Sequence, residues 1–258
     1  MINISTNHWS IDSINAVLFD KDGTLIDSHK YWGRIIERRA LALISKFHLD
    51  KALFSDICLT MGLCTDKWKL IKEGPIALVN REQVIKILAD YLLKLNIQVS
   101  HNDIDEIFVR EHNEFLNEIF DYIELLPDVI PLLKAIKAKS VKIAVVTSDS
   151  VKNTEETLKY LKIDNYFDLI IGKESTVEPK HTGIPALKAM ELLKANNNET
   201  ICIGDAPMDL IMAKNADLKA GIGITTGQID YDELLEYSPY ISTSLGDINI
   251  KEGLWISK

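Results

Sequence analysis

The stretch VLFDKDGTLID, residues 17–27, begins as an apolar run and then ends on two aspartates that flank one lysine. Carboxylates are costly to bury and repel one another, so Asp20 and Asp22 need a chemical reason to stand at a strand end. Gly23 follows at once and permits a sharp turn before Thr24. We therefore expect a site that uses both carboxylates at the end of this strand.

The composition limits what the protein can be. A chain of 258 residues with 47% hydrophobic residues can fill one large core or two modest ones. The formal net charge of -9 argues against a nucleic-acid binder, which would carry a basic patch. Residues 1–15 have neither the basic nor the apolar region of a signal peptide, and the sequence has no apolar run of 18 residues. We expect a cytoplasmic protein that has no membrane partner.

The second half of the chain alternates between two kinds of pattern. Short apolar or β-branched runs predict strands at 141–147, 167–172, 200–205 and 218–224. Helical stretches lie around them, at 128–138, about 151–162, about 183–195 and 207–216. Alternation of this kind predicts a parallel sheet with helices on both faces.

The first half of the chain has a different character. From Tyr31 to about Leu125 the apolar residues follow a helical spacing. The strand predicted at 16–19 needs sheet neighbours, and only the C-terminal part can provide them. The predicted fold class is therefore α/β, with a Rossmann-like parallel sheet core and an inserted all-α helical cap domain. Residues 1–29 and 126–258 would form the core and residues 30–125 the cap.

Polar side chains gather where the predicted strands end. In an open parallel sheet, ligands bind beyond the carboxyl ends of the strands. The residues that would meet at this edge are Asp20, Asp22, Thr147, Ser148, Asp205 and Asp209, with Lys180 in a turn before the next helix. Four carboxylates, hydroxyls and a lysine would therefore converge on one rim.

These residue types suit phosphoryl chemistry with a metal. The hard oxygens of Asp20 and Asp205 can hold Mg²⁺. Asp20 could also attack phosphorus and form an aspartyl-phosphate, while Asp22 protonates the leaving oxygen and later activates water. A hydroxyl at Thr147 can donate to a phosphoryl oxygen, and Lys180 can neutralise charge.

The same residues resemble the four ordered motifs of the haloacid-dehalogenase-like hydrolases. The motifs are DKDGT, Thr147, Lys180 and GDAPMD, and the resemblance extends to AGIGITTGQ and PYISTSLGDI, as in the phosphoglycolate-phosphatase-like branch. It implies that Asp20 is the nucleophile and that Asp22 is the acid/base, with its backbone carbonyl on magnesium. It further implies phosphate binding by Thr147 and Lys180, a metal ligand at Asp205, and a ligand or holder of a metal-bound water at Asp209. Gly23, Thr24 and Ser148 would complete the substrate-binding set.

The expected function is a magnesium-dependent phosphatase that acts on a small phosphorylated metabolite, as a monomer or a homodimer. A sugar phosphomutase of the same superfamily and a catalytically idle binding module remain alternatives. Many relatives have proline after the motif lysine, whereas His181 follows Lys180 here, so Lys173 remains a second candidate for that lysine.

Two cationic clusters in the cap leave their roles open. The stretch GLCTDKWKLIKEG, residues 62–74, carries Lys67, Lys69 and Lys72. It is interpreted either as a solvated charged helix face or as a specificity loop that closes over the substrate. Arg34, Arg38 and Arg39 in the first cap helix pose the same question.

Overall fold

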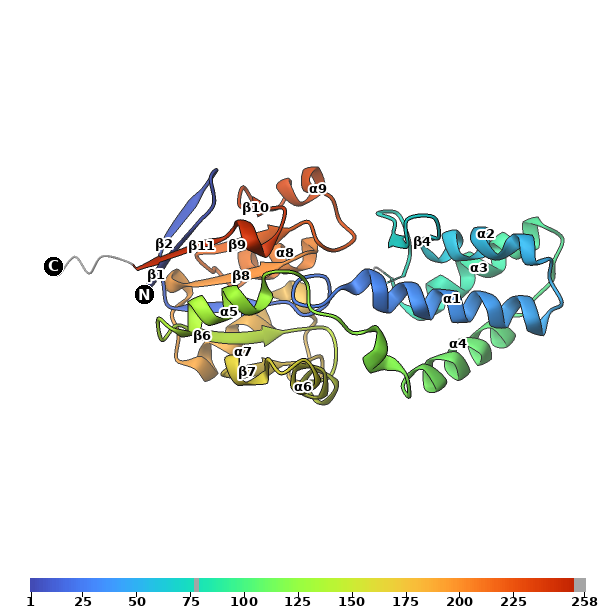
Figure 1. Ribbon diagram of the computed structural model, residues 1–258, viewed down its shortest axis with the longest axis horizontal. Coiled ribbons are helices and arrows are strands. Elements are labelled where there is room, and N and C mark those ends of the chain that lie inside the picture. Colours follow the sequence, from blue (N-terminus) through green and yellow to red (C-terminus); the bar gives the residue numbers. More distant parts are fainter. Residues whose placement is uncertain (77–78, 253–258) are drawn as a thin grey trace. The chain divides into compact units, whose positions relative to one another are not determined.

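The computed structural model describes residues 1–76 and 79–252, and the chain divides into two compact units (Figure 1). The core unit comprises residues 1–27 together with the chain from Glu124 onward. The helical unit comprises Ser28–Ile123. Each boundary lies two residues before the position expected from the sequence.

A six-stranded parallel sheet, in the order β10-β9-β8-β3-β6-β7, organises the core unit. Its strands are β3 Ala16–Phe19, β6 Lys142–Val146, β7 Leu169–Ile171, β8 Thr200–Gly204, β9 Ala220–Ile224 and β10 Ile241–Ser242. The chain adds β6 and β7 on one side of β3, and then β8, β9 and β10 on the other side. The side on which the chain adds new strands therefore changes at β3. Ligands of open parallel sheets bind where the strand order reverses in this way.

The helices of the core unit follow the strands in the predicted alternation. They are α5 Val129–Lys137, α6 Val151–Tyr160, α7 Ile184–Leu193, α8 Pro207–Asn215 and α9 Tyr231–Leu235, with the short 3-10 turns η3 Asp164–Tyr166, η4 Lys180–Thr182, η5 Asn197–Glu199 and η6 Leu245–Asp247. The five strands and four helices predicted for this unit are confirmed, with ends that differ by at most two residues.

Both faces of the sheet are buried. Successive side chains of a strand point to opposite faces, so Leu18, Ala144 and Cys202 share one face and pack with apolar residues of α7 and α8. Val17 and Phe19 point the other way and are also fully buried. Burial on both faces explains why the strands appear in the sequence as continuous apolar runs.

The two connections to the helical unit run side by side in the core unit. The Asp27 backbone N–H donates to Glu124 O at 2.9 Å, and the Leu126 N–H donates to Leu25 O at 3.0 Å. The helical unit therefore leaves and re-enters the core at one place, as expected for an insertion.

A second sheet was not predicted from the sequence. The strands β1 Ile2–Ser5, β2 Ser10–Ile14 and β11 Asn249–Glu252 form an antiparallel sheet in the order β11-β1-β2. Ile2 and Ile4 of β1 are fully buried and alternate with more exposed polar residues. This period-two pattern is the local signal for a half-buried strand, although its partner β11 lies at the opposite end of the chain.

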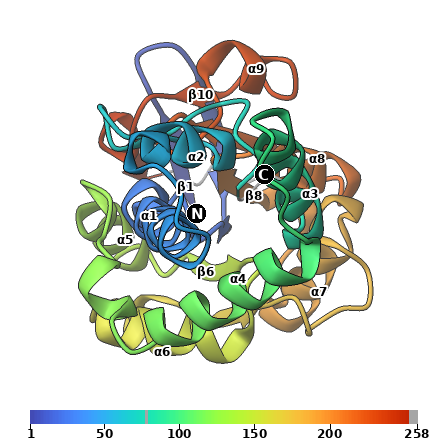
Figure 2. The ribbon, with the colours of Figure 1, turned by 90° about the vertical axis from the view of Figure 1, so that its right-hand side faces the viewer.

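Helices dominate the second unit. They are α1 Ser28–Lys46, α2 Phe54–Met61, α3 Arg81–Lys94 and α4 His101–Phe115, with the 3-10 turns η1 Lys51–Leu53 and η2 Ile119–Tyr122. Figure 2 shows α1 nearly end-on, and α1 packs against α2 and α4, which both contact α3. Among the described residues of both units, no helix is long and apolar enough to cross a membrane.

The stretch 62–74 is a hairpin, so its interpretation as a charged helix face was wrong. Strand β4 Leu63–Cys64 pairs antiparallel with β5 Lys69–Leu70. Gly62 has φ 107° and ends α2 in the left-handed conformation, which stops the helix before the lysines. His29 Nδ1 accepts a hydrogen bond from the Leu70 N–H at 3.2 Å, which ties β5 to the start of α1.

The arginines of α1 contribute to the packing of the helical unit. Arg34 pairs with Glu37 and Glu118. Arg38 pairs with three glutamates, which are Glu111 at 3.2 Å, Glu114 at 2.9 Å and Glu118 at 3.0 Å.

Arg39 is buried with its guanidinium carbon 4.1 Å from the centre of the Phe108 ring. Burial lowers the pKa of Arg39 to about 10.

We predict that Arg38→Met lowers the free energy of unfolding by about 1.5–3 kcal/mol, because the buried Glu111 loses a charged partner. Arg81→Met is the matched control in the same unit, since Arg81 and its partner Asp105 have side chains that are 53% and 42% exposed. That change should cost less than about 1 kcal/mol. Urea unfolding followed by circular dichroism measures both values, and equal costs would contradict the structural role of Arg38.

Candidate active site

Three strand ends and one 3-10 turn of the core unit bring the predicted residues together. Asp20 follows β3, Thr147 follows β6 and Asp205 follows β8. In the ladder, Phe19 pairs with both Val145 and Ile203, so these ends lie at one edge of the sheet. The Asp20 N–H continues the ladder by donating to Ile203 O at 2.9 Å.

Lys180 joins two of the carboxylates. Its Nζ lies 2.5 Å from Asp20 Oδ1 and 2.5 Å from Asp209 Oδ1, although the second contact lacks the angle of a hydrogen bond. Burial alone would lower the pKa of Lys180, but the charges of Asp20 and Asp209 outweigh it and raise that pKa. Lys173 is exposed, so the geometry favours Lys180 as the motif lysine.

The start of α8 positions Asp209. Pro207 is the first residue of the helix, and Asp209 Oδ2 accepts a hydrogen bond from the Ala206 N–H at 3.0 Å. The residue is only 1% exposed. Burial raises the pKa of Asp209 to about 6, although Lys180 opposes the shift.

Asp205 lies against two glycines. Gly23 has φ 88°, and a Cβ there or at Gly227 would overlap the Asp205 carboxylate. Thr24 is fully buried, and its Oγ1 donates to Asp205 Oδ1 at 3.3 Å. Burial, together with the charges of Asp20 and Asp209, raises the pKa of Asp205 well above its ordinary value.

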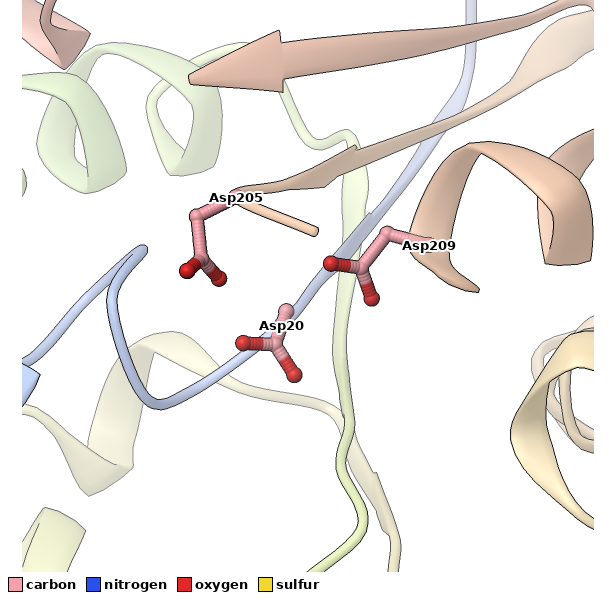
Figure 3. A group of neighbouring side chains, drawn as sticks. All are labelled: Asp20, Asp205 and Asp209. Atoms are coloured by element: carbon pink, nitrogen blue, oxygen red, sulfur yellow. The ribbon is translucent and has the colours of Figure 1, made fainter. Parts of the chain in front are cut away.

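The three buried carboxylates fit a divalent cation. Figure 3 shows Asp20, Asp205 and Asp209 turned toward one another, and one oxygen of each lies within 4.8 Å of the others. Lys180 offsets only one of the three negative charges, so two remain for a cation to balance. Hard oxygen donors of this kind suit Mg²⁺. The Asp22 carboxylate is outside this group; the resemblance assigned it a metal contact only through its backbone carbonyl.

Asp22 belongs to a second charged group at the same edge. Lys21 Nζ lies 3.2 Å from Asp22 Oδ2 and 2.8 Å from Asp149 Oδ2. Partial burial raises the pKa of Asp22, and Lys21 opposes that shift. Partial burial of Asp149 would also raise its pKa, but Lys21 outweighs this effect and lowers it.

The loop after β6 holds the predicted phosphate-binding hydroxyls. Thr147 is buried, and its Oγ1 accepts a hydrogen bond from the Asp149 N–H at 3.1 Å. Ser148 is exposed. The N-cap of α6 is Ser150, and its neighbour Asp149 forms the ion pair with Lys21.

Three residues of the site were not assigned there from the sequence. Lys21 and Asp149 were passed over because their contact joins positions 128 residues apart. Gly227 was not singled out either, although it lies in the AGIGITTGQ stretch that carried part of the resemblance. Its neighbour Thr226 donates its Oγ1 proton to Gly23 O at 2.6 Å, which ties that stretch to the turn after Asp22.

Comparison with known proteins gives relatives that span most of the chain. Pyrophosphatase PpaX of Halalkalibacterium halodurans is 27% identical over 238 residues, which are 91% of this chain and 95% of that protein. The phosphoglycolate phosphatase of Aquifex aeolicus is 27% identical over 212 residues, which are 82% of this chain and 85% of that protein.

The fold has close counterparts among solved structures. The crystal structure of a "predicted phosphoglycolate phosphatase" from Haemophilus somnus aligns with a TM-score of 0.69 at 20% identity, over 92% of this chain and 97% of that one. A family model described as haloacid dehalogenase-like hydrolase matches residues 14–217, which include DKDGT, Thr147, Lys180 and GDAPMD. The resemblance seen in the sequence is thereby confirmed, and the chain belongs to the haloacid dehalogenase-like hydrolases.

Proposed function

We propose that the protein is a magnesium-dependent phosphatase that hydrolyses a small phosphorylated metabolite through an aspartyl-phosphate on Asp20. It would act in the cytoplasm, as a monomer or a homodimer. One observation carries the proposal: Lys180 Nζ lies 2.5 Å from the buried Asp20 carboxylate, at the strand edge that also holds Asp205 and Asp209. The names of the two relatives, both phosphatases, support the same reaction class.

In the first step an Asp20 oxygen forms a bond to phosphorus, and the bond from phosphorus to the leaving oxygen breaks. Asp22 gives its proton to that oxygen, so the oxygen departs as a hydroxyl group and not as an alkoxide. Lys180 binds Asp20 Oδ1 and fixes the direction of the carboxylate. Thr147 and Ser148 would hold the phosphoryl oxygens from the loop after β6.

In the second step water attacks phosphorus, and Asp22 accepts its proton. The bond between phosphorus and Asp20 breaks, which releases phosphate and restores the carboxylate. Asp20, Asp205 and Asp209 would hold Mg²⁺, with the Asp22 backbone carbonyl as a further ligand by the family resemblance. The ion would supply positive charge that offsets the phosphoryl oxygens and the carboxylates.

The substrate class follows from the chemistry that the relatives' names share. Pyrophosphate and phosphoglycolate each carry a second anionic group beyond the scissile phosphate. The helical unit would serve as a cap that selects the substrate and excludes water. Lys67 and Lys69 of the β4–β5 hairpin are exposed and, among the described residues, form no ion pair. We propose that they bind the second anion.

Phosphate release tests the proposed function. Purified protein is assayed with an aryl phosphate, pyrophosphate and phosphoglycolate, with Mg²⁺ and with an excess of chelator. We expect turnover that requires Mg²⁺ and that Ca²⁺ cannot support, because calcium prefers more ligands at longer distances. Isomerisation of a sugar phosphate without phosphate release would instead indicate a phosphomutase. Binding without turnover would indicate an idle module.

We predict that Asp20→Asn abolishes turnover, because no other carboxylate of the site takes the place of the nucleophile. Asp22→Asn should slow turnover by about 10²–10⁴-fold, the usual range for general acid/base catalysis. Steady-state assays of the purified variants measure both. Near-native activity of Asp20→Asn would refute the covalent mechanism.

Gly227→Ala tests the metal site separately. The added Cβ would overlap the carboxylate and the Cβ of Asp205, so the carboxylate has to move from its place in the site. We expect Mg²⁺ affinity to fall at least about tenfold, because metal-site ligands and their supports typically contribute 10- to 100-fold each. Calorimetric titration with Mg²⁺ measures this. Gly246→Ala is the matched control, since its Cβ would overlap the carboxylate of Asp128 instead; equal Mg²⁺ affinities of the two variants would exclude Asp205 as a ligand.

We also predict that Lys67→Ala and Lys69→Ala each raise KM for phosphoglycolate or pyrophosphate by about 3- to 10-fold, as expected for a partly solvated charge contact. An aryl phosphate without a second anion should be almost unaffected, because both substrates share the same phosphoryl chemistry. Lys86→Ala, at an exposed position of α3, serves as the charge control. Equal effects on both kinds of substrate would remove the hairpin lysines from substrate selection.

A further inference from the structure

Lys21 lies between the two motif aspartates, and the mechanism above gives it no part. Its side chain is only 7% exposed. The ammonium lies 2.8 Å from Asp149 Oδ2 and 3.2 Å from Asp22 Oδ2. One buried cation therefore connects the turn after β3 to the loop after β6.

Asp149 is a fixed anchor for this cation. Its Oδ1 accepts hydrogen bonds from the Ser150 N–H at 2.7 Å and from Asn153 Nδ2 at 3.2 Å. Its backbone N–H donates to Thr147 Oγ1, and its backbone carbonyl accepts from the Lys173 N–H at 2.8 Å. The ion pair with Asp149 therefore fixes the position of Lys21 relative to the loop that carries Thr147.

Asp22, in contrast, has few constraints of its own. Its side chain is 38% exposed. No described residue donates a hydrogen bond to the Asp22 carboxylate, so the ion pair of Lys21 with Oδ2 is the contact that orients it. That contact leaves Oδ1 available for proton exchange.

The charge on Lys21 is not needed to fill space. A methionine has a similar length and could lie at the same buried position without the desolvation cost of an ammonium group. Such a cost is recovered only when well-placed carboxylates surround the cation. The presence of a lysine between Asp22 and Asp149 therefore points to a role in placing a carboxylate.

We propose that Lys21 is a positioning residue for proton transfer: it fixes the Asp22 carboxylate relative to the Thr147 loop so that the free oxygen meets the leaving group. This inference rests on the proposed phosphatase function. Lys21 itself neither donates nor accepts the transferred proton, which passes from Asp22 to the leaving oxygen and later from water to Asp22.

Comparing substrates that differ in their leaving groups separates this positioning role from a general structural role of Lys21. The quantity to measure is kcat/KM, which covers the steps through the first phosphoryl transfer. An alkyl phosphate needs a proton on its leaving oxygen, whereas dinitrophenyl phosphate does not, because its leaving group is stable as an anion. For Lys21→Met we expect kcat/KM to fall about 10- to 100-fold with the alkyl phosphate, and less than about threefold with dinitrophenyl phosphate.

A double-mutant cycle tests whether Lys21 acts through Asp22. Lys21→Met placed on Asp22→Asn should cause no further loss with the alkyl phosphate, because the group that it positions is already absent. Lys152→Met, at a side chain that is 82% exposed, controls for the loss of one positive charge. If Lys21→Met does not fold, Lys21→Gln takes its place, since it keeps a polar donor without the charge, and the same selective loss is expected.

Equal losses with both substrates would overturn the inference, because Lys21 would then support the site as a whole. A further loss on the Asp22→Asn background would overturn it as well. These outcomes leave the phosphatase function standing, since the wild-type protein turns over both esters in the same experiment. A wild-type protein that hydrolyses neither ester would overturn the proposed function and this inference with it.

Discussion

The contact of Lys180 with Asp20 and Asp209 is the interaction on which the site depends. Asp20, Asp205 and Asp209 offer oxygens within 4.8 Å of one another in a buried setting. Two like charges at that distance repel by on the order of 3 kcal/mol at an effective dielectric constant of about 20. The single ammonium relieves part of this repulsion. The remainder appears in the raised pKa of Asp205, and a bound divalent cation would remove it.

The backbone of the core unit holds the three carboxylates close together despite their repulsion. Asp20 and Asp205 extend adjacent parallel strands, and Asp209 is held by the first turn of α8. Small residues at Gly23 and Gly227 leave room for the Asp205 carboxylate. A second cation, Lys21, repeats the same arrangement with Asp22 and Asp149. Each of the two lysines thus contacts two carboxylates at this edge of the sheet.

Five of the six strands of the core sheet and most of the site could be predicted from the sequence because their signals are local. A buried parallel strand is a continuous apolar run, and β3 has the bounds expected from that run alone. Asp20, Thr147 and Asp205 could be placed together because parallel strands bring their carboxyl ends to one edge.

The features that escaped prediction depend on contacts between distant positions. The pairing of β1 with β11 joins the two ends of the chain, and no local sequence pattern predicts which strand β1 pairs with. The same holds for Lys21 with Asp149 and for Arg38 with its three glutamates. The hairpin at 62–74 was missed for another reason: its strands have two residues each, too few for a periodic pattern.

Chemical trapping of the phosphorylated enzyme tests the central claim most directly. With dinitrophenyl phosphate the first step is fast, so the aspartyl-phosphate should accumulate and survive a rapid acid quench. Borohydride reduces an acyl phosphate to an alcohol, and peptide mass spectrometry locates the change. We expect homoserine at position 20, formed only when substrate is present. Steady phosphate release without this modification, or with the modification at another carboxylate, would contradict the assignment of Asp20 as the nucleophile.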